Sequence, residues 1–249
     1  MDIPLDIQHQ AMGYDRTATM FSPQGHLLQV EYAEKTVRLG SSSVGVTCAD
    51  GVFIVADLRV EDKLVLPKSA NKIYEIDSHI ISSVAGIVSD ARVLIEKAQV
   101  SAQQNRITYD SPIEPELIIK EIANLQQQFT QYGGARPFGV SLMVAGINND
   151  KKPELYTSDV TGNYLSYKAT AIGENDEKFK EMLREKYTSS LTIKKGVQMV
   201  LEMFKQVEDK KFNIERFEVC YIDKETGELK RLYDKELQEF VKWLKQQQE

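Results

Sequence analysis

The side chains best suited to metal binding or nucleophilic catalysis are few in this chain, with two cysteines and three histidines in 249 residues. Cys48 and Cys220 lie in strand-like runs, which indicates reduced, buried thiols in a cytosolic protein. His9, His26 and His79 are dispersed and make no metal-ligand spacing with cysteines or carboxylates. The sequence also lacks a Gly-x-Ser-x-Gly motif and suggests no Cys–His pairing. We therefore expect no metal and no cofactor.

A second set of polar side chains lies near the N-terminus, where Tyr14, Asp15 and Arg16 follow one another. The Tyr14 hydroxyl and the Asp15 carboxylate can hydrogen-bond between neighbouring subunits, and Arg16 can pair with a carboxylate. Ordinary surface polarity would explain the same residues. They follow residues 1–13, for which a free tail is the plain expectation.

The element that must position these residues is an amphipathic helix from about residue 26 to residue 39. A tetrapeptide at 22–25, Ser-Pro-Gln-Gly, precedes it and has the preferences of a type I turn. Gly40 is a fitting C-terminal stop. Two Glu-first i,i+4 pairs support the helix, Glu31 with Lys35 and Glu34 with Arg38. The apolar face consists of Leu27, Leu28, Val30, Tyr32, Ala33, Val37 and Leu39.

Strand-like and helical segments then alternate in blocks along the chain. Asp50-Gly51 between two β-rich runs predicts a hairpin. Further strands are expected around 64–66, 72–76, 80–85, 138–147, 154–158, 164–172 and from 217, with a turn at 224–227. Helices are expected at about 89–106, 114–131, 175–187 and 192–205. A closing helix capped by Asp234 is expected to turn Leu237, Phe240, Val241 and Leu244 inward.

This order of elements predicts an α+β fold. Hairpin-length links between the strands imply antiparallel sheets. Two such sheets stacked face to face, with helix pairs on both outer faces, would bury every apolar stripe. We therefore expect one domain with a four-layer α/β/β/α sandwich and an extra N-terminal helix.

Composition narrows the possible partners. A formal net charge of −6 argues against nucleic acid as the main partner. No apolar run approaches the roughly 20 residues needed to span a bilayer, so no membrane association is expected. The first ten residues carry two aspartates and no apolar core, which is unlike a secretory signal.

Several rigidly spaced motifs occur together in this chain: YDR at 14–16, FSPQG at 21–25, QVEYA at 29–33, GSSSVGV at 40–46, SVAGIVSDARVL at 83–94, TQYGGARPFGVSLMVAGI at 130–147 and YKATAIGE at 167–174. Together they resemble the alpha subunits of archaeal 20S proteasomes. The resemblance implies the fold of N-terminal nucleophile hydrolases. It divides a single domain, 1–249, into a flexible gate tail at 1–13, an alpha-type extension and helix at 14–40, and the sandwich core at 41–249.

That fold raises the hypothesis of catalysis by an N-terminal nucleophile whose free α-amine acts as the base. Ser41 lies where catalytic beta subunits carry the nucleophile, and Asp57 lies near their supporting acid. However, Ser41 follows forty residues, so its nitrogen is an amide without a basic lone pair. Cleavage at Gly40 would free it but would discard the amphipathic helix. A catalytic member of the fold is therefore the runner-up, and a stand-alone binding module is a third class.

The resemblance also assigns residues to a gate and a port. Tyr14, Asp15, Pro23 and Tyr32 match the cluster that holds the open gate in alpha rings, and we group Arg16 with them. The segment Tyr132-Gly133-Gly134-Ala135 matches the loop at the narrow port of the ring. Its plain alternative is a helix C-cap followed by a turn, and both roles are compatible.

Lys72, Gly86 and Glu31 match a pocket between adjacent alpha subunits. There the Lys72 ammonium would meet the C-terminal carboxylate of an activator tail with the pattern hydrophobic-Tyr-any. A solvated strand-edge lysine is the plain alternative. Gly86 would let the tail approach the backbone. Glu31 would line the pocket or pair with Lys35.

The resemblance therefore implies a non-catalytic, cytoplasmic alpha subunit. Its expected partners are copies of itself in a seven-membered ring, a separate ring of beta subunits that bear the threonine proteases, an ATPase regulatory particle such as a proteasome-activating nucleotidase, and unfolded protein substrates.

Overall fold

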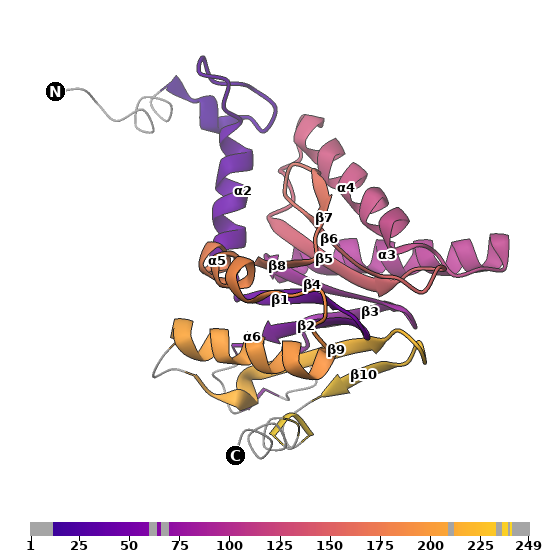
Figure 1. The fold of residues 1–249 in the computed structure, drawn as a ribbon. Helices are drawn as coiled ribbons and strands as arrows, with labels where there is room; N and C mark the ends of the chain where they lie inside the picture. The colour runs from indigo at the N-terminus through magenta and orange to yellow at the C-terminus, as the bar shows by residue number, and fades with distance from the viewer. Residues whose placement is uncertain are drawn as a thin grey trace.

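Two antiparallel five-stranded sheets lie face to face in the described part of the chain (Figure 1). The structure is a computed structural model that describes residues 12–59, 64–65, 70–208, 212–232, 236–238 and 240. The first sheet has the order β10-β9-β2-β1-β8, with β1 (Ser43–Cys48), β2 (Gly51–Asp57), β8 (Ala169–Ile172), β9 (Phe217–Asp223) and β10 (Leu229–Leu232). The second has the order β3-β4-β5-β6-β7, with β3 (Ile73–Asp77), β4 (Ile80–Gly86), β5 (Val140–Ile147), β6 (Pro153–Ser158) and β7 (Tyr164–Ser166).

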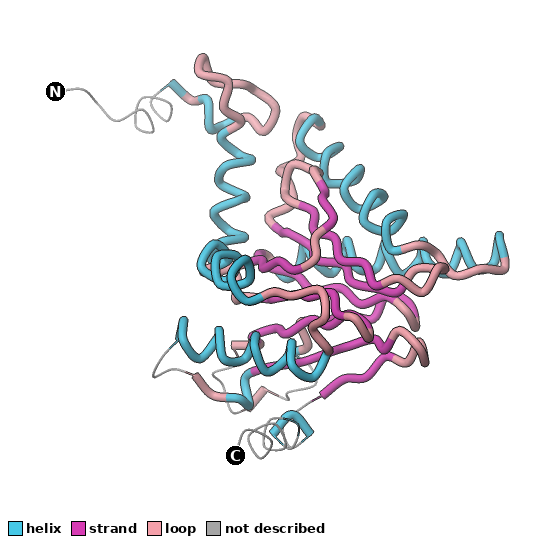
Figure 2. Tube along the Cα trace, in the orientation of Figure 1, coloured by secondary structure: helices cyan, strands magenta, loops and turns pink. Residues whose placement is uncertain are grey.

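Helices cover the outer faces of both sheets (Figure 2). Helices α3 (Val88–Tyr109) and α4 (Pro115–Gln131) pack on the second sheet, whereas α5 (Asp176–Lys186) and α6 (Ile193–Glu208) pack on the first. Side chains between the sheets form a third apolar layer, which includes Ile54, Ile81, Met143 and Cys220. Apolar residues recur at every second position along the strands and at helical spacing along the helices, so they lie on the surfaces that face one another. Stacking the layers therefore buries the apolar side of each helix and strand. The predicted four-layer sandwich is confirmed.

The hairpin at Asp50 is also confirmed. Strands β1 and β2 pair from Ser43 with Ala56 to Cys48 with Gly51, which leaves a two-residue turn. The Asp50 carboxylate accepts a hydrogen bond of 2.8 Å from the backbone nitrogen of Ile193, at the first residue of α6. The turn therefore satisfies one of the free amides at the start of that helix.

Both cysteines are free and buried, as the sequence predicts. Burial raises the pKa of the Cys48 thiol to about 12 and also raises the pKa of Cys220. Thiols with such a raised pKa carry little thiolate near neutral pH, so both cysteines act as small apolar core residues.

Helix α2 (Leu28–Leu39) begins two residues later than predicted and lies outside the sandwich, against β4 and β5. Its buried side chains are Leu28, Val30 and Ala33, with Val37 packed beside them and Val160 as the partner from the sandwich.

The expected ion pair of Glu31 with Lys35 is absent from the described contacts. Glu31 pairs with His26 at the start of the helix, and Lys35 lies 5.2 Å from the centre of the Tyr32 ring. Glu34 and Arg38 also form no close ion pair within the described contacts, although the charge of Arg38 opposes the burial that raises the pKa of the Glu34 carboxyl.

Two predicted strands are wrong. The segment at 164–172 forms two strands, because β7 pairs with β6 in the second sheet whereas β8 pairs with β1 in the first. Leu64 and Val65 lie in a turn and a bend, and residue 66 lies outside the described residues. Near the C-terminus 236–238 and 240 are helical, with Leu237 buried and Phe240 packed against the α6 side of the core. Asp234, Val241 and Leu244 lie outside the described residues.

Gly40, the residue that ends α2, offers a test of how this helix is joined to the sandwich. A Cβ atom at Gly40 would press into the backbone of Gly86, whereas a Cβ at Gly133 would meet nothing within 4 Å. We expect Gly40→Ala to destabilise the chain by about 1–3 kcal/mol through overpacking. Gly133→Ala serves as the matched control and should change the melting temperature little. Equal melting temperatures for both variants, measured by circular dichroism at one protein concentration, would contradict this packing.

Candidate functional site

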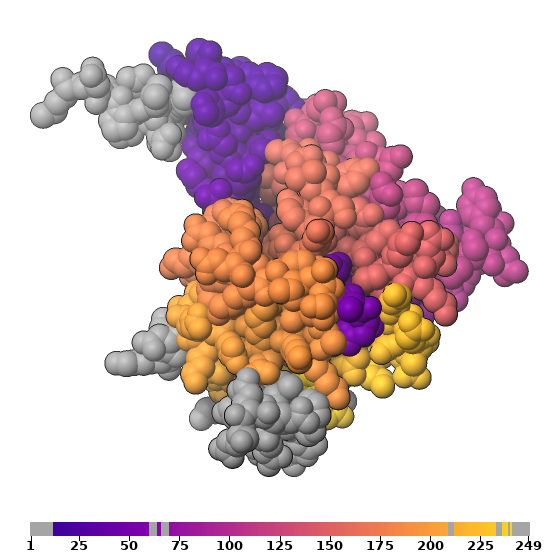
Figure 3. Space-filling view, in the orientation of Figure 1, coloured from indigo at the N-terminus to yellow at the C-terminus, as the bar shows by residue number. Residues whose placement is uncertain are grey.

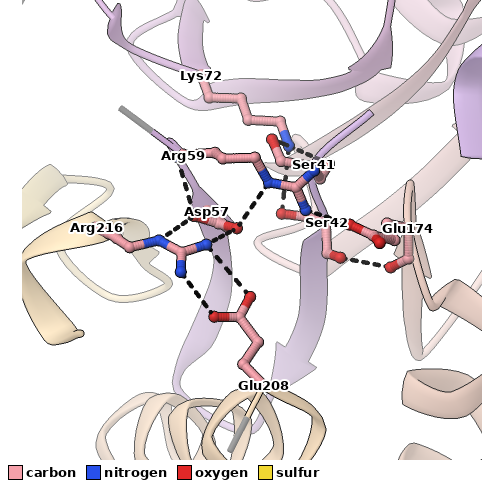
Figure 4. Close-up of polar contacts among 8 residues, drawn as sticks. All are labelled: Ser41, Ser42, Asp57, Arg59, Lys72, Glu174, Glu208 and Arg216. Carbon is pink, nitrogen blue, oxygen red and sulfur yellow. Dashed lines mark hydrogen bonds and ion pairs between the residues drawn. The ribbon is translucent and has the colours of Figure 1, made fainter. Parts of the chain in front are cut away.

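The joint between α2 and β1 carries the densest set of polar contacts among the predicted site residues. Lys72, directly before β3, directs its side chain to Ser41, which lies just before β1 (Figure 4). The Lys72 ammonium donates hydrogen bonds to the Ser41 carbonyl oxygen, to Ser41 Oγ at 2.7 Å and to the Ser42 carbonyl oxygen at 3.3 Å. Lys72 is therefore not the solvated strand-edge lysine that the plain alternative would require.

Burial controls the charge of this lysine. Removal of the ammonium from water lowers the pKa of Lys72 to about 7, and the positive charge of Arg59 acts in the same direction. The negative charges of Asp57 and Glu218 oppose the shift without offsetting it. Lys72 is thus close to half-protonated near neutral pH.

Asp57, at the end of β2, is a fully buried carboxylate at the centre of a network of charged side chains. Its carboxylate accepts hydrogen bonds from Arg216 at 2.6 and 3.2 Å, and Arg216 also pairs with Glu208 at 3.1 Å (Figure 4). Arg59 lies 3.8 Å from the same carboxylate and pairs with Glu174. A fully buried carboxylate is tolerable here because two guanidinium groups compensate its charge.

Glu218, on β9, forms the other arm of the network and is fully buried. One of its oxygens accepts hydrogen bonds from the backbone nitrogens of Lys72 and Ile73, at 2.9 and 3.0 Å, and the other pairs with Arg231. Burial raises the pKa of the Glu218 carboxyl, although these donors and Arg231 oppose that shift. The carboxylate thereby attaches the start of β3 to the first sheet.

Sequence reasoning singled out Ser41, Asp57 and Lys72 but missed the partners that complete the network. These partners are Arg59, Glu174, Glu208, Arg216, Glu218 and Arg231. Most of them lie in ordinary charged stretches of the sequence, and the pairs Arg59–Glu174 and Arg216–Asp57 join residues 115 and 159 positions apart. The one available signal was a charged residue inside an otherwise apolar strand, as at Glu218 in β9.

The arrangement at Ser41 lacks a base of the N-terminal type. A hydroxyl beside an amine resembles a nucleophile–base pair. However, the Ser41 nitrogen is a backbone amide, and the Gly40 carbonyl before it accepts a 2.8 Å hydrogen bond from the Glu174 backbone nitrogen. Among the described residues no three His, Cys, Asp or Glu side chains are grouped to hold a metal ion, and none of the helices could cross a membrane.

Of the predicted gate residues, Tyr14, Asp15 and Arg16 form η1, whereas Pro23 lies in the turn before α2 and Tyr32 lies within α2. The short helix η1 (Tyr14–Arg16) rests against α2, where Gln29 Nε2 donates a 2.6 Å hydrogen bond to the Asp15 carbonyl oxygen. The predicted turn is present, because the Gly25 nitrogen donates to the Ser22 carbonyl oxygen at 2.8 Å, with Pro23 exposed between them. In the space-filling view this end of the chain projects from the body of the molecule (Figure 3).

The predicted port loop lies next to the segment that follows η1. Arg16, Thr17, Ala18 and Thr19 line one hollow together with Gly133, Gly134, Ala135 and Arg136. Tyr132 ends α4 and is 65% exposed, so its ring is available to a partner. The loop is held at its other end by Arg136, which makes a two-pronged ion pair with Asp90 at 2.6 and 2.7 Å.

The three predicted pocket residues are not all brought together. Lys72 and Gly86 converge on the Gly40–Ser41 joint, since Lys72 bonds to Ser41 and Gly40 packs on the Gly86 backbone. Glu31 lies nine residues before Gly40 on the same helix, which corresponds to about 13 Å along the helix axis. Within one chain Glu31 therefore lies apart from the other two residues. The gate, port and pocket roles stay predictions.

Comparisons with known proteins identify the class of this fold and site. The family model described as "Proteasome subunit" matches residues 37–222. The chain therefore belongs to the proteasome subunit family. A second model, which describes the N-terminal signature of the A-type proteasome subunits, matches residues 14–35, which comprise η1, the turn and much of α2. Within the family this chain is accordingly of the alpha type.

Relatives from archaea agree with that assignment. The chain is 42% identical over 230 residues to the proteasome alpha subunit of Archaeoglobus fulgidus, covering 92% of this chain and 93% of the relative. It is 40% identical over 235 residues to that of Methanothermobacter thermautotrophicus, with 94% of each chain covered. For the Pyrococcus abyssi protein the identity is 39% over 229 residues, covering 92% of this chain and 87% of the relative.

The ion pair at the port loop leads to a pH prediction. The hydrogen bonds from Arg136 hold the pKa of the Asp90 carboxyl below its usual value. The ionised carboxyl therefore stabilises the fold above about pH 4, and this stabilisation is lost as pH falls through the folded-state pKa. Because Arg136 is exposed, we expect Asp90→Asn to cost only about 1 kcal/mol at neutral pH. In urea unfolding the difference should shrink as the pH falls below about 4.

The control for this prediction is Asp150→Asn, which breaks an exposed ion pair with Lys152. It should change the unfolding free energy by less than about 0.5 kcal/mol. A loss in Asp90→Asn that stays constant down to pH 3 would show that the charge of Asp90 is not the stabilising feature.

Proposed function

We propose that this chain is a non-catalytic alpha subunit of a 20S proteasome core in the cytoplasm. It forms a ring of seven copies, stacks on a separate ring of catalytic beta subunits and controls the passage of unfolded protein into the core. It also docks the C-terminal tails of an ATPase activator. The observation that carries this proposal is the segment from η1 through α2 to Ser41, of which residues 14–35 match the alpha signature.

The absence of catalysis follows from that segment. A nucleophile of the N-terminal type needs a free α-amine with a pKa near 8, whereas the Ser41 nitrogen is bonded to Gly40. Cutting this bond would separate α2 from the sandwich and expose the apolar contacts of Val30 and Ala33 with Val160. The catalytic alternative therefore requires the loss of an element that is packed on the core.

The remaining surface of α2 supports a role between subunits. Leu39, at its C-terminal end, is 78% exposed, and Phe21, before the helix, is 63% exposed. Apolar groups of this size outside the core favour contact with a neighbouring copy in a head-to-tail ring. A stand-alone binding module would leave them in water.

The pocket for activator tails would combine residues from two copies. One copy would contribute Lys72 and Gly86, and its neighbour would contribute Glu31. An ammonium group captures a terminal carboxylate without demanding a fixed geometry. The gate residues Tyr14, Asp15, Arg16, Pro23 and Tyr32 would then respond through α2, and the loop at 132–135 would narrow the port.

Intact-mass measurement tests the absence of self-processing. We expect the purified chain, alone or in assemblies with beta subunits, to keep the segment before Ser41. A product that begins at Ser41 would support the catalytic alternative, because the cleavage would create the missing amine.

Substitution of the pocket lysine tests activator docking. In complexes assembled with beta subunits, we expect Lys72→Ala to abolish stimulation of protein degradation by an ATPase activator, while ring assembly and basal peptide cleavage persist. Lys152→Ala is the matched control, because that lysine is exposed and lies on the surface. Stimulation that survives in Lys72→Ala would refute the pocket assignment.

A further inference from the structure

Every hydrogen-bond donor of the Lys72 ammonium is already used within the chain. An ammonium group has three N–H bonds. They face three oxygens, namely the carbonyl and hydroxyl oxygens of Ser41 and the carbonyl oxygen of Ser42. All three acceptors are neutral, and no carboxylate of the described residues lies within ion-pairing distance of the Lys72 ammonium. A terminal carboxylate that binds Lys72 must therefore displace at least one of these oxygens.

The nearby carboxylates are occupied by other groups. Asp57 pairs with Arg216, and Glu218 pairs with Arg231 while accepting two backbone hydrogen bonds. Further out in the network lie Arg59, Glu174 and Glu208. Each of these charges has its own partner. The Lys72 ammonium, by contrast, contacts neutral oxygens and none of the described carboxylates. That arrangement favours an incoming anion.

We infer that Ser41 is an internal ligand of the Lys72 ammonium, which the terminal carboxylate of an activator tail replaces, so that Ser41 sets the affinity of this pocket. The inference rests on the proposed docking function. Hydrogen bonds from an ammonium to a carboxylate are about twice as strong as those between neutral groups. A carboxylate therefore replaces Ser41, whereas water or a C-terminal amide does not.

The exchange also affects α2, which carries Tyr32 and contacts η1, the element of Tyr14, Asp15 and Arg16. Ser41 follows Gly40, which ends α2, and the Gly40 carbonyl is tied to the backbone of Glu174. At the other end of the same helix Gln29 holds η1 through the Asp15 carbonyl. Release of Ser41 from Lys72 thus loosens one end of α2 while the other end contacts the gate.

The exchange depends on pH in a defined direction. Lys72 is faced by Asp57 and Arg59 at the end of β2, by Glu218 on β9, and by the neutral oxygens of Ser41 and Ser42. Burial lowers the pKa of Lys72 to about 7, so a growing fraction of chains holds a neutral amine above that pH. Carboxylate binding requires the ammonium, and affinity should fall by up to about tenfold per pH unit above pH 7.

The test measures binding of a short synthetic peptide that ends in Leu-Tyr-Ala with a free carboxylate to assembled rings, by fluorescence anisotropy. Ser41→Ala removes one competing oxygen, so we expect about fivefold tighter binding. Ser42→Ala is the matched control, because the Ser42 hydroxyl donates to the Glu174 carbonyl rather than contacting Lys72. The same peptide with a C-terminal amide should not bind.

The outcomes separate this inference from the proposed function. If Lys72→Ala loses binding but Ser41→Ala binds like the unmodified chain or more weakly, the internal-ligand role is wrong and the docking function stands. If Lys72→Ala keeps full affinity, the docking function itself fails. Binding by the unmodified chain that is constant between about pH 6 and pH 9 would show that Lys72 stays charged over this range and would overturn the expected pH dependence, independently of any variant.

Discussion

The joint at Gly40 and Ser41 is the constraint on which the rest of this structure depends. It connects a helix outside the sandwich to the first strand inside it, and three contacts hold it in place. Gly40 packs on the backbone of Gly86, its carbonyl accepts a hydrogen bond from the Glu174 backbone, and Lys72 donates hydrogen bonds to Ser41. The same covalent connection that joins α2 to β1 removes the amine that catalysis of the N-terminal type would need. The attachment of α2 to the sandwich and the lack of a free amine at Ser41 therefore have one physical origin.

Burial of charge explains why the joint is so well defined. Four carboxylates, those of Asp57, Glu174, Glu208 and Glu218, meet four cations, Arg59, Arg216, Arg231 and Lys72. The formal charges balance, but the pairing is unequal. The three arginines each contact a carboxylate, whereas the lysine contacts neutral oxygens. Because a buried charge without a counter-ion is unfavourable, Lys72 is the member of the network most responsive to a new anion.

Helix α2 connects η1, which lies within the alpha signature, to the joint at Gly40 and Ser41. Its N-terminal part touches η1 through Gln29, and its C-terminal end is the joint itself. A helix is a stiff element, so a displacement at one end is carried to the other without an intervening chain of side-chain contacts. The port loop lies beside residues 16–19, and Arg136 anchors it to Asp90. The residues proposed for the pocket, the gate and the port thus lie close to one rigid element.

Local patterns in the sequence determined the helices, the hairpin at Asp50, the inward residues Leu237 and Phe240, and the turn before α2. Each depends on contacts a few residues apart, and such contacts leave a period or a turn signature. Tertiary structure alone decided three other features: the division of 164–172 between two sheets, the pairing of Glu31 with His26, and the inward direction of Lys72. The first and third features depend on residues that lie far apart in the chain and that compete to pair with the same strand edge or the same cation. In the second, several nearby partners suit one carboxylate. The sequence shows which residues could pair, and the packing of the folded chain determines which of these pairs form.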